Sequence, residues 1–139
     1  MNQAAPPALP TVVGRIEEKT DQRLVLAVEG TDYRLHLVPA GPVDAAVGQR
    51  VRGVVRIEAR RVDVVPAGGW FIEPVYGRPR RVQGRIIGGD VHANELHLRA
   101  GAPLIVKLEL AQKAADFYVG HMVSFDVKAG ATFELVRDD

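Results

Sequence analysis

The chain of 139 residues is 47% hydrophobic and 25% charged, with 18 basic and 17 acidic side chains and no cysteine. The absence of cysteine excludes a disulfide framework, a thiolate zinc site, an iron–sulfur cluster and a cysteine nucleophile. The formal charge of +1 gives no bulk electrostatic reason to expect binding to nucleic acid or to a membrane.

The first ten residues contain three prolines and predict a disordered N-terminal arm over 1–10. This segment has neither the basic start nor the apolar run of a secretory signal. No stretch of the chain approaches the roughly 18 consecutive apolar residues that a membrane-spanning helix needs. We therefore expect a cytoplasmic protein.

Short patterns in the first half of the chain recur in the second half, in the same order and 70 to 73 residues later. Residues 13–16 (VGRI) recur as 83–86 (QGRI), and residues 47–51 (VGQRV) recur as 119–123 (VGHMV). Three further matches join 24–26 to 96–98, 33–37 to 106–110 and 62–65 to 133–136. This internal repeat predicts two copies of one unit, over 11–66 and 82–136.

Each copy contains five segments in which apolar and polar side chains alternate, the pattern of half-buried strands. In chain order the predicted strands are 11–18, 23–29, 32–38, 50–58 and 61–66, then 82–87, 95–100, 104–110, 121–128 and 131–136. Gly30 and Gly101 lie in turns where tight hairpins need a positive φ. The connector 111–118 favours one or two helical turns, whereas 39–47, with two prolines, favours at most one.

Three strands, a connector and two further strands resemble the oligonucleotide/oligosaccharide-binding (OB) fold, and the glycines of the GRI and VGQRV segments strengthen this resemblance. The resemblance implies an all-β protein of two five-stranded barrels in tandem, with single-stranded nucleic acid as the default ligand. Other small barrels, SH3-like ones included, are the alternative fold. Because a unit of about 55 residues is marginal alone, the copies are expected to pack on each other or to dimerise.

The segment 67–81 between the copies is richer in aromatic residues than a flexible linker. It contains Trp70, Phe71, Tyr76, Arg78, Arg80 and Arg81. One interpretation is a stacking platform beside guanidinium groups that bind phosphates, as in single-strand binders. Another, favoured by the large contribution of aromatic side chains to interfaces, is that they pack between the two barrels. A third is an exposed patch for a protein partner.

The segment 50–58 places three basic side chains, Arg50, Arg52 and Arg56, on one face of the predicted strand. They form a candidate basic stripe for an anionic ligand, although we favour a solvated strand face whose charges discourage edge pairing. The second copy does not repeat the stripe, because its residues 83–139 carry six basic and eight acidic side chains. An anionic ligand is therefore expected at the first copy and the linker.

Nothing in the sequence predicts catalysis, a metal or a cofactor. The sole serine, Ser124, lies within a predicted strand and faces outward, unlike a nucleophile on a sharp turn. Phosphate-binding glycine loops are absent, and the four histidines are scattered without metal-ligand spacing: His36, His92, His97 and His121. We therefore expect a non-enzymatic binding module for single-stranded nucleic acid. The alternative is a protein–protein adaptor or assembly subunit, or a homodimer, that uses the linker aromatics as its interface.

Overall fold

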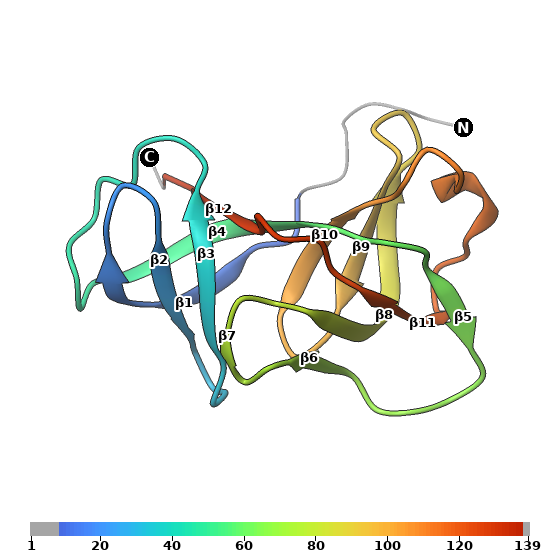
Figure 1. Cartoon of the computed structure of the whole chain (residues 1–139), viewed down its shortest axis with the longest axis horizontal. Coiled ribbons are helices and arrows are strands. Elements are labelled where there is room, and N and C mark those ends of the chain that lie inside the picture. Colours follow the sequence, from blue (N-terminus) through green and yellow to red (C-terminus); the bar gives the residue numbers. More distant parts are fainter. Residues whose placement is uncertain (1–8, 138–139) are drawn as a thin grey trace.

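The computed structural model describes residues 9–137, so the arm predicted over 1–10 lies almost entirely outside the described residues. The protein is nearly all β, with 52% strand and 2% helix. Figure 1 shows two groups of strands side by side, with the long strand β4 running from one group to the other. The all-β prediction is confirmed, and each of the ten predicted strands forms.

Five strands close into a barrel: β1 (Val12–Lys19), β2 (Leu24–Val28), β3 (Arg34–Pro39), β12 (Thr132–Leu135) and β4 (Arg50–Glu58). β4 returns to pair with β1, which closes the ring. Neighbouring strands of the barrel are antiparallel except β3 and β12, which run parallel. Inward-facing side chains fill the barrel as alternation requires, among them Ile16, Leu26, Leu35, Val55 and Phe133, all fully buried.

The second group contains β8 (Arg81–Asp90), β9 (Glu95–Arg99), β10 (Pro103–Lys107), β11 (Met122–Asp126) and β5 (Asp63–Val65). Its order is β10-β9-β8-β11-β5, and β10 also pairs with the end of β4 in parallel. One cluster of buried apolar side chains, from Val12 to Phe133, includes residues of both groups. The two groups therefore share a core, which compensates for the small size of each.

The barrel is completed by the last strand of the chain and not by the predicted strand 61–66. That strand forms as β5, but it pairs with β11, while β12 pairs with β4. The segments that follow β4 and β11 meet at Ala59 and Val127, which form an isolated antiparallel bridge. A physical reason lies at Gly53, where an added Cβ would be 2.3 Å from the Phe133 ring, so the missing side chain makes room for β12.

Corresponding residues of the two groups make the same hydrogen bonds. The Ile16 N–H donates to Gln49 at 3.1 Å, and the Ile86 N–H donates to His121 at 2.9 Å. Likewise, Nη1 of Arg15 donates to the carbonyl of Gly48 at 3.1 Å, and Nη1 of Arg85 donates to that of Gly120 at 2.7 Å. Both first strands, β1 and β8, also carry a register irregularity after the matched isoleucine.

The connecting segments agree with their predicted turn chemistry. Gly30 and Gly101 have φ of 76° and 83°, the positive values expected of them. The connector 111–118 contains one short 3₁₀ turn, η1 (Ala114–Asp116). The segment between the groups forms two short strands that were not predicted: β6 (Phe71–Glu73) pairs with β8, and β7 (Tyr76–Gly77) pairs in parallel with β3. The linker is thereby hydrogen-bonded to both groups.

Candidate binding groove

A groove of about 440 Å³ runs along β3, between the β1–β2 turn, the linker and the loop that precedes β12. Its basic lining residues are Arg23, His36, Arg78 and Arg80, and backbone of Gly77 and Gly130 contributes to its walls. These residues come from four separate parts of the sequence: the β1–β2 turn, β3, the linker and the loop before β12. The groove therefore exists only because β12 and the linker both lie against β3.

The outward face of β3 forms the floor of the groove. Leu35 and Leu37 are buried in the barrel, so the alternation of the strand turns His36 outward. The imidazole lies edge-on against the ring of Tyr76, with 5.0 Å between the ring centroids. Its Nε2 atom is buried and has no hydrogen-bond partner among residues 9–137.

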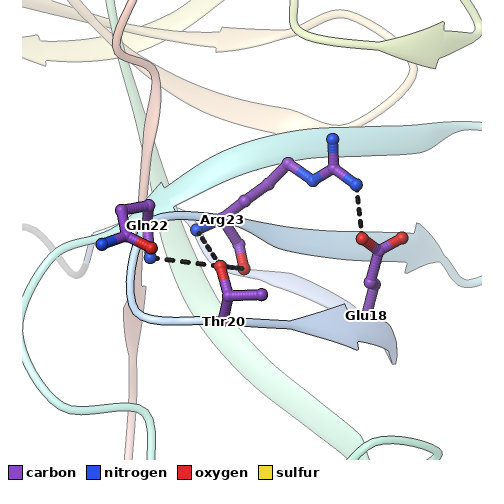
Figure 2. A network of polar contacts seen from close by, with 4 residues as sticks. All are labelled: Glu18, Thr20, Gln22 and Arg23. Atoms are coloured by element: carbon purple, nitrogen blue, oxygen red, sulfur yellow. Dashed lines mark hydrogen bonds and ion pairs between the residues drawn. The ribbon is translucent and has the colours of Figure 1, made fainter.

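The β1–β2 turn forms one wall, and Thr20 holds its shape (Figure 2). The Thr20 Oγ1 atom accepts hydrogen bonds from the backbone N–H groups of Gln22 and Arg23, at 3.2 and 3.0 Å. The Thr20 N–H donates to the Arg23 carbonyl at 2.7 Å. The Arg23 side chain reaches back to form an ion pair with Glu18. One of the groove's guanidinium groups is thus already paired.

The linker forms the opposite wall. The Arg34 N–H donates to the carbonyl of Val75 at 2.8 Å, which fixes β7 beside β3. Further along the linker, Arg78 is half-buried and Arg80 is exposed. Within the described residues neither of these two side chains forms an ion pair. The groove therefore holds two guanidinium groups whose charge no carboxylate of this part of the chain balances.

The structure divides the predicted linker residues into three sets. Arg78 and Arg80 line the groove, and Tyr76, 63% exposed, lies beside it against the ring of His36. Trp70, 49% exposed, precedes β6 and lies with half-buried Phe71 on the side of β8. The linker buries Ile72 and Pro79, whereas Trp70 and Tyr76 are exposed and do not fill the space between the two groups.

Arg81, the remaining linker arginine, lies away from the groove. Its Nη1 atom forms an ion pair with Asp126 at 2.8 Å, and its Nη2 atom donates to Oγ of Ser124 at 2.8 Å. Ser124 is only 4% exposed, so the sole serine is a buried hydrogen-bond acceptor. Arg81 is engaged in holding β8 to β11.

The basic stripe predicted on 50–58 is largely neutralised. Arg50 pairs with Glu29 at 2.7 Å and Arg56 pairs with Glu134 at 3.0 Å, while Arg52 is half-buried on the same strand. The hydrogen bond from Arg50 lowers the pKa of Glu29, and Glu29 raises the pKa of Arg50. Both carboxylates come from distant segments, which the sequence pattern did not place beside β4. Arg50 and Arg56 are therefore surface ion pairs.

Two groove residues, Arg23 and His36, were not selected from the sequence. His36 carried a weak signal, since alternation within 32–38 predicted its outward orientation. For Arg23 the sequence contained no signal of a binding role beyond its position after a turn. Both gain significance only from the linker, whose pairing with β3 depends on a two-residue strand.

A larger hollow of about 700 Å³ lies over β1 and β2, but its charges are already satisfied. Arg34 pairs with Glu17 at 2.9 Å, Glu29 pairs with Arg50, and Arg15 donates to the Gly48 carbonyl. In the second group, the segment around η1 is held to the β8–β9 turn by Asn94. There Asn94 donates to the Gln112 carbonyl at 2.9 Å and accepts from the Ala114 N–H at 2.8 Å.

Comparison of the chain with protein families, with curated proteins and with solved structures gives no match. Over residues 9–137 there is no group of three His, Asp or Glu side chains that could hold a metal ion. Nor does the described part of the chain contain a helix long and apolar enough to cross a membrane. The groove offers arginine side chains and an imidazole, with the exposed ring of Tyr76 beside the imidazole.

Proposed function

We propose that this protein is a binding module for single-stranded nucleic acid and that the groove along β3 is its binding site. The observation that carries the proposal is the meeting of Arg78 and Arg80 with the exposed ring of Tyr76 on one face of the barrel. Guanidinium groups bind phosphates, and aromatic rings stack on bases of any sequence. A single strand offers both partners at once, whereas the bases of a duplex are already stacked.

The arrangement of the barrel supports this proposal. We propose that the barrel is OB-like, with β12 as its fifth strand parallel to β3. In OB folds, oligonucleotides bind the face of the second and third strands and the loops after the first and fourth. The groove lies on β3, between the turn after β1 and the loop that precedes β12, which is the corresponding place.

We further propose that the two groups of strands are copies of one unit whose last strands are exchanged. The matched hydrogen bonds of Arg15 and Arg85, and the matched turns at Gly30 and Gly101, support this view. Only in the first group does the linker lie beside the third strand, so the copies would differ in function. The binding site would belong to the first group, and the second would stabilise it.

Fluorescence anisotropy of a labelled twelve-nucleotide single strand tests the proposed site. We expect binding that weakens steeply with salt, because bound phosphates release counterions. Replacing the two linker arginines that line the groove, Arg78→Gln with Arg80→Gln, should weaken binding about tenfold and flatten the salt dependence by roughly 0.7 in log–log slope per lost contact. Arg99→Gln is the control, since Arg99 is exposed on β9, away from the groove. No binding at low salt and tens of micromolar protein would refute the proposal.

The exposed apolar side chains of the linker favour one second candidate, a protein–protein adaptor or homodimer. Trp70, Val75 and Tyr76 are 49%, 51% and 63% exposed, and such side chains often mark interfaces. Sedimentation of the wild type and of Trp70→Ala separates the two functions. If the protein self-associates through the linker, the mass of the assembly in solution should fall in Trp70→Ala. Single-strand binding instead predicts an unchanged mass for Trp70→Ala and a weaker affinity for the strand in Tyr76→Ala.

A further inference from the structure

We propose that His36 contacts the bound anion in its protonated form, so that ligand binding takes up a proton and strengthens as the pH falls. This inference rests on the proposed function of the groove and adds a specific role for the residue at its floor. It concerns how binding is regulated, which the arginines alone do not address.

The position of His36 is the first support. Its side chain lines the same groove as Arg23, Arg78 and Arg80, on the outward face of β3. The Nε2 atom is buried without a partner, which leaves Nδ1 as the ring nitrogen available to a ligand. The two nitrogens of a protonated imidazole are both donors, so Nδ1–H can donate to a phosphate oxygen.

The charges around His36 supply the second support. The β1–β2 turn contributes Arg23, paired with Glu18, and the linker contributes Tyr76, Arg78 and Arg80. Opposite His36 on β2 lies the uncharged Val25, and the loop before β12 contributes only Gly130 and Ala131. On β3 itself Arg34 is paired with Glu17. Asp21 of the β1–β2 turn and Glu73 of the linker form no ion pair among the described residues, but neither lines the groove, so positive charge predominates there.

A bound phosphate reverses this balance. A proton on the imidazole adds a further positive charge to a groove that already contains guanidinium groups. An anion in the groove attracts that charge and gives the Nδ1–H group an acceptor. By linkage, a ligand that favours the protonated imidazole must bind more tightly when protons are abundant. The coupling is limited to one proton for each occupied groove.

Isothermal titration calorimetry with an oligothymidylate of twelve nucleotides tests the coupling, because thymine does not take up protons at mildly acidic pH. Titrations at pH 8 and pH 5.5, each in two buffers of different ionisation enthalpy, give the affinity and the number of protons taken up. We expect roughly tenfold tighter binding at pH 5.5 than at pH 8. We also expect each binding event to take up a fraction of a proton from the buffer. Circular dichroism at both pH values establishes that the protein stays folded.

His36→Gln should lose both the pH dependence of the affinity and the proton uptake, whatever its affinity at pH 8. His92→Gln, which changes an exposed histidine in the β8–β9 turn, should retain both. Binding without proton uptake, or uptake that persists in a folded His36→Gln protein, overturns this inference and leaves the proposed function standing. If the wild type binds at neither pH, the proposed function itself fails. If His36→Gln does not fold, His36→Asn provides the same comparison.

Discussion

The side-chain amide of Gln112 makes the two hydrogen bonds to the Val62 backbone that a neighbouring strand would otherwise make. The Val62 N–H donates to Oε1 of Gln112 at 2.7 Å, and Nε2 of Gln112 donates to the Val62 carbonyl at 2.8 Å. Val62 is buried and immediately precedes β5, the strand that pairs with the second group. Since buried backbone groups must find partners, this one side chain holds in place the segment that joins β4 to β5.

Gln112→Ala should therefore be costly, because it leaves a buried donor and a buried acceptor without partners. We expect the free energy of unfolding to fall by about 2–6 kcal/mol, from about 1–3 kcal/mol for each of the two unsatisfied groups. Urea denaturation followed by circular dichroism measures the change. Gln22→Ala, on the exposed β1–β2 turn, is the control and should stay within about 0.5 kcal/mol of the wild type. Equal midpoints for Gln112→Ala and the wild type would contradict the role assigned to this pair.

The strands were predictable because alternation records which face of a segment is buried. Leu35 and Leu37 point into the barrel and His36 points out, as their spacing requires. Alternation does not record which strand lies alongside. The segments 62–65 (VDVV) and 133–136 (FELV) have the same order of apolar and charged residues, so their exchange between the groups was invisible in the sequence.

The groove was only partly predictable for the same reason. Tyr76, Arg78 and Arg80 were selected because aromatic and basic residues crowd one short segment. The ion partners of Arg50 and Arg56 could not be predicted, because Glu29 and Glu134 reach them only through strand pairing. The strands β6 and β7, of three and two residues, are too short for alternation to reveal.

Gly53→Ala should weaken the attachment of β12 to the barrel. A Cβ at this position would lie 2.3 Å from Cζ of Phe133 and 2.6 Å from the carbonyl oxygen of Glu134. We expect a loss of about 3 kcal/mol in the free energy of unfolding, at the upper end of overpacking costs. Gly69→Ala is the control, since a Cβ there meets no atom within 4 Å. Phe133→Leu in the Gly53→Ala background should cost less than the two changes added together, because it removes the ring but not the backbone contact. If the losses in unfolding free energy of the two single variants simply added, the strain in Gly53→Ala would not arise from the Phe133 ring.

Tyr33→Phe should loosen the linker without unfolding the protein. The Ile72 N–H donates to Oη of Tyr33 at 3.1 Å, which fastens β6 to the start of β3. Loss of this hydrogen bond should cost about 1 kcal/mol and speed hydrogen exchange at the Ile72 amide several-fold. Nuclear magnetic resonance measures that exchange directly. The amide of Leu26 in the barrel is the internal reference and should keep its wild-type rate, and unchanged exchange at Ile72 would show that another contact holds the linker.

Acid should destabilise the protein through His97. Its side chain is only 5% exposed, and burial lowers its pKa below the usual 6.5, although Glu95 and Asp90 act in the opposite direction. In the unfolded chain the imidazole binds a proton near pH 6.5, so just below that pH the unfolded state holds more protons than the folded state. The free energy of unfolding should therefore fall as the pH drops through 6.5, by at most about 1.4 kcal/mol per pH unit for one histidine.

His97→Leu removes the titrating group from a position whose cross-strand neighbour is the buried Ile105. Urea denaturation between pH 5 and pH 7.5 should show a shallower pH dependence for this variant than for the wild type, because no imidazole remains to bind a proton on unfolding. His92→Gln, at an exposed histidine, should leave the wild-type slope unchanged. Parallel pH profiles for His97→Leu and the wild type would show that the acid sensitivity arises from other groups.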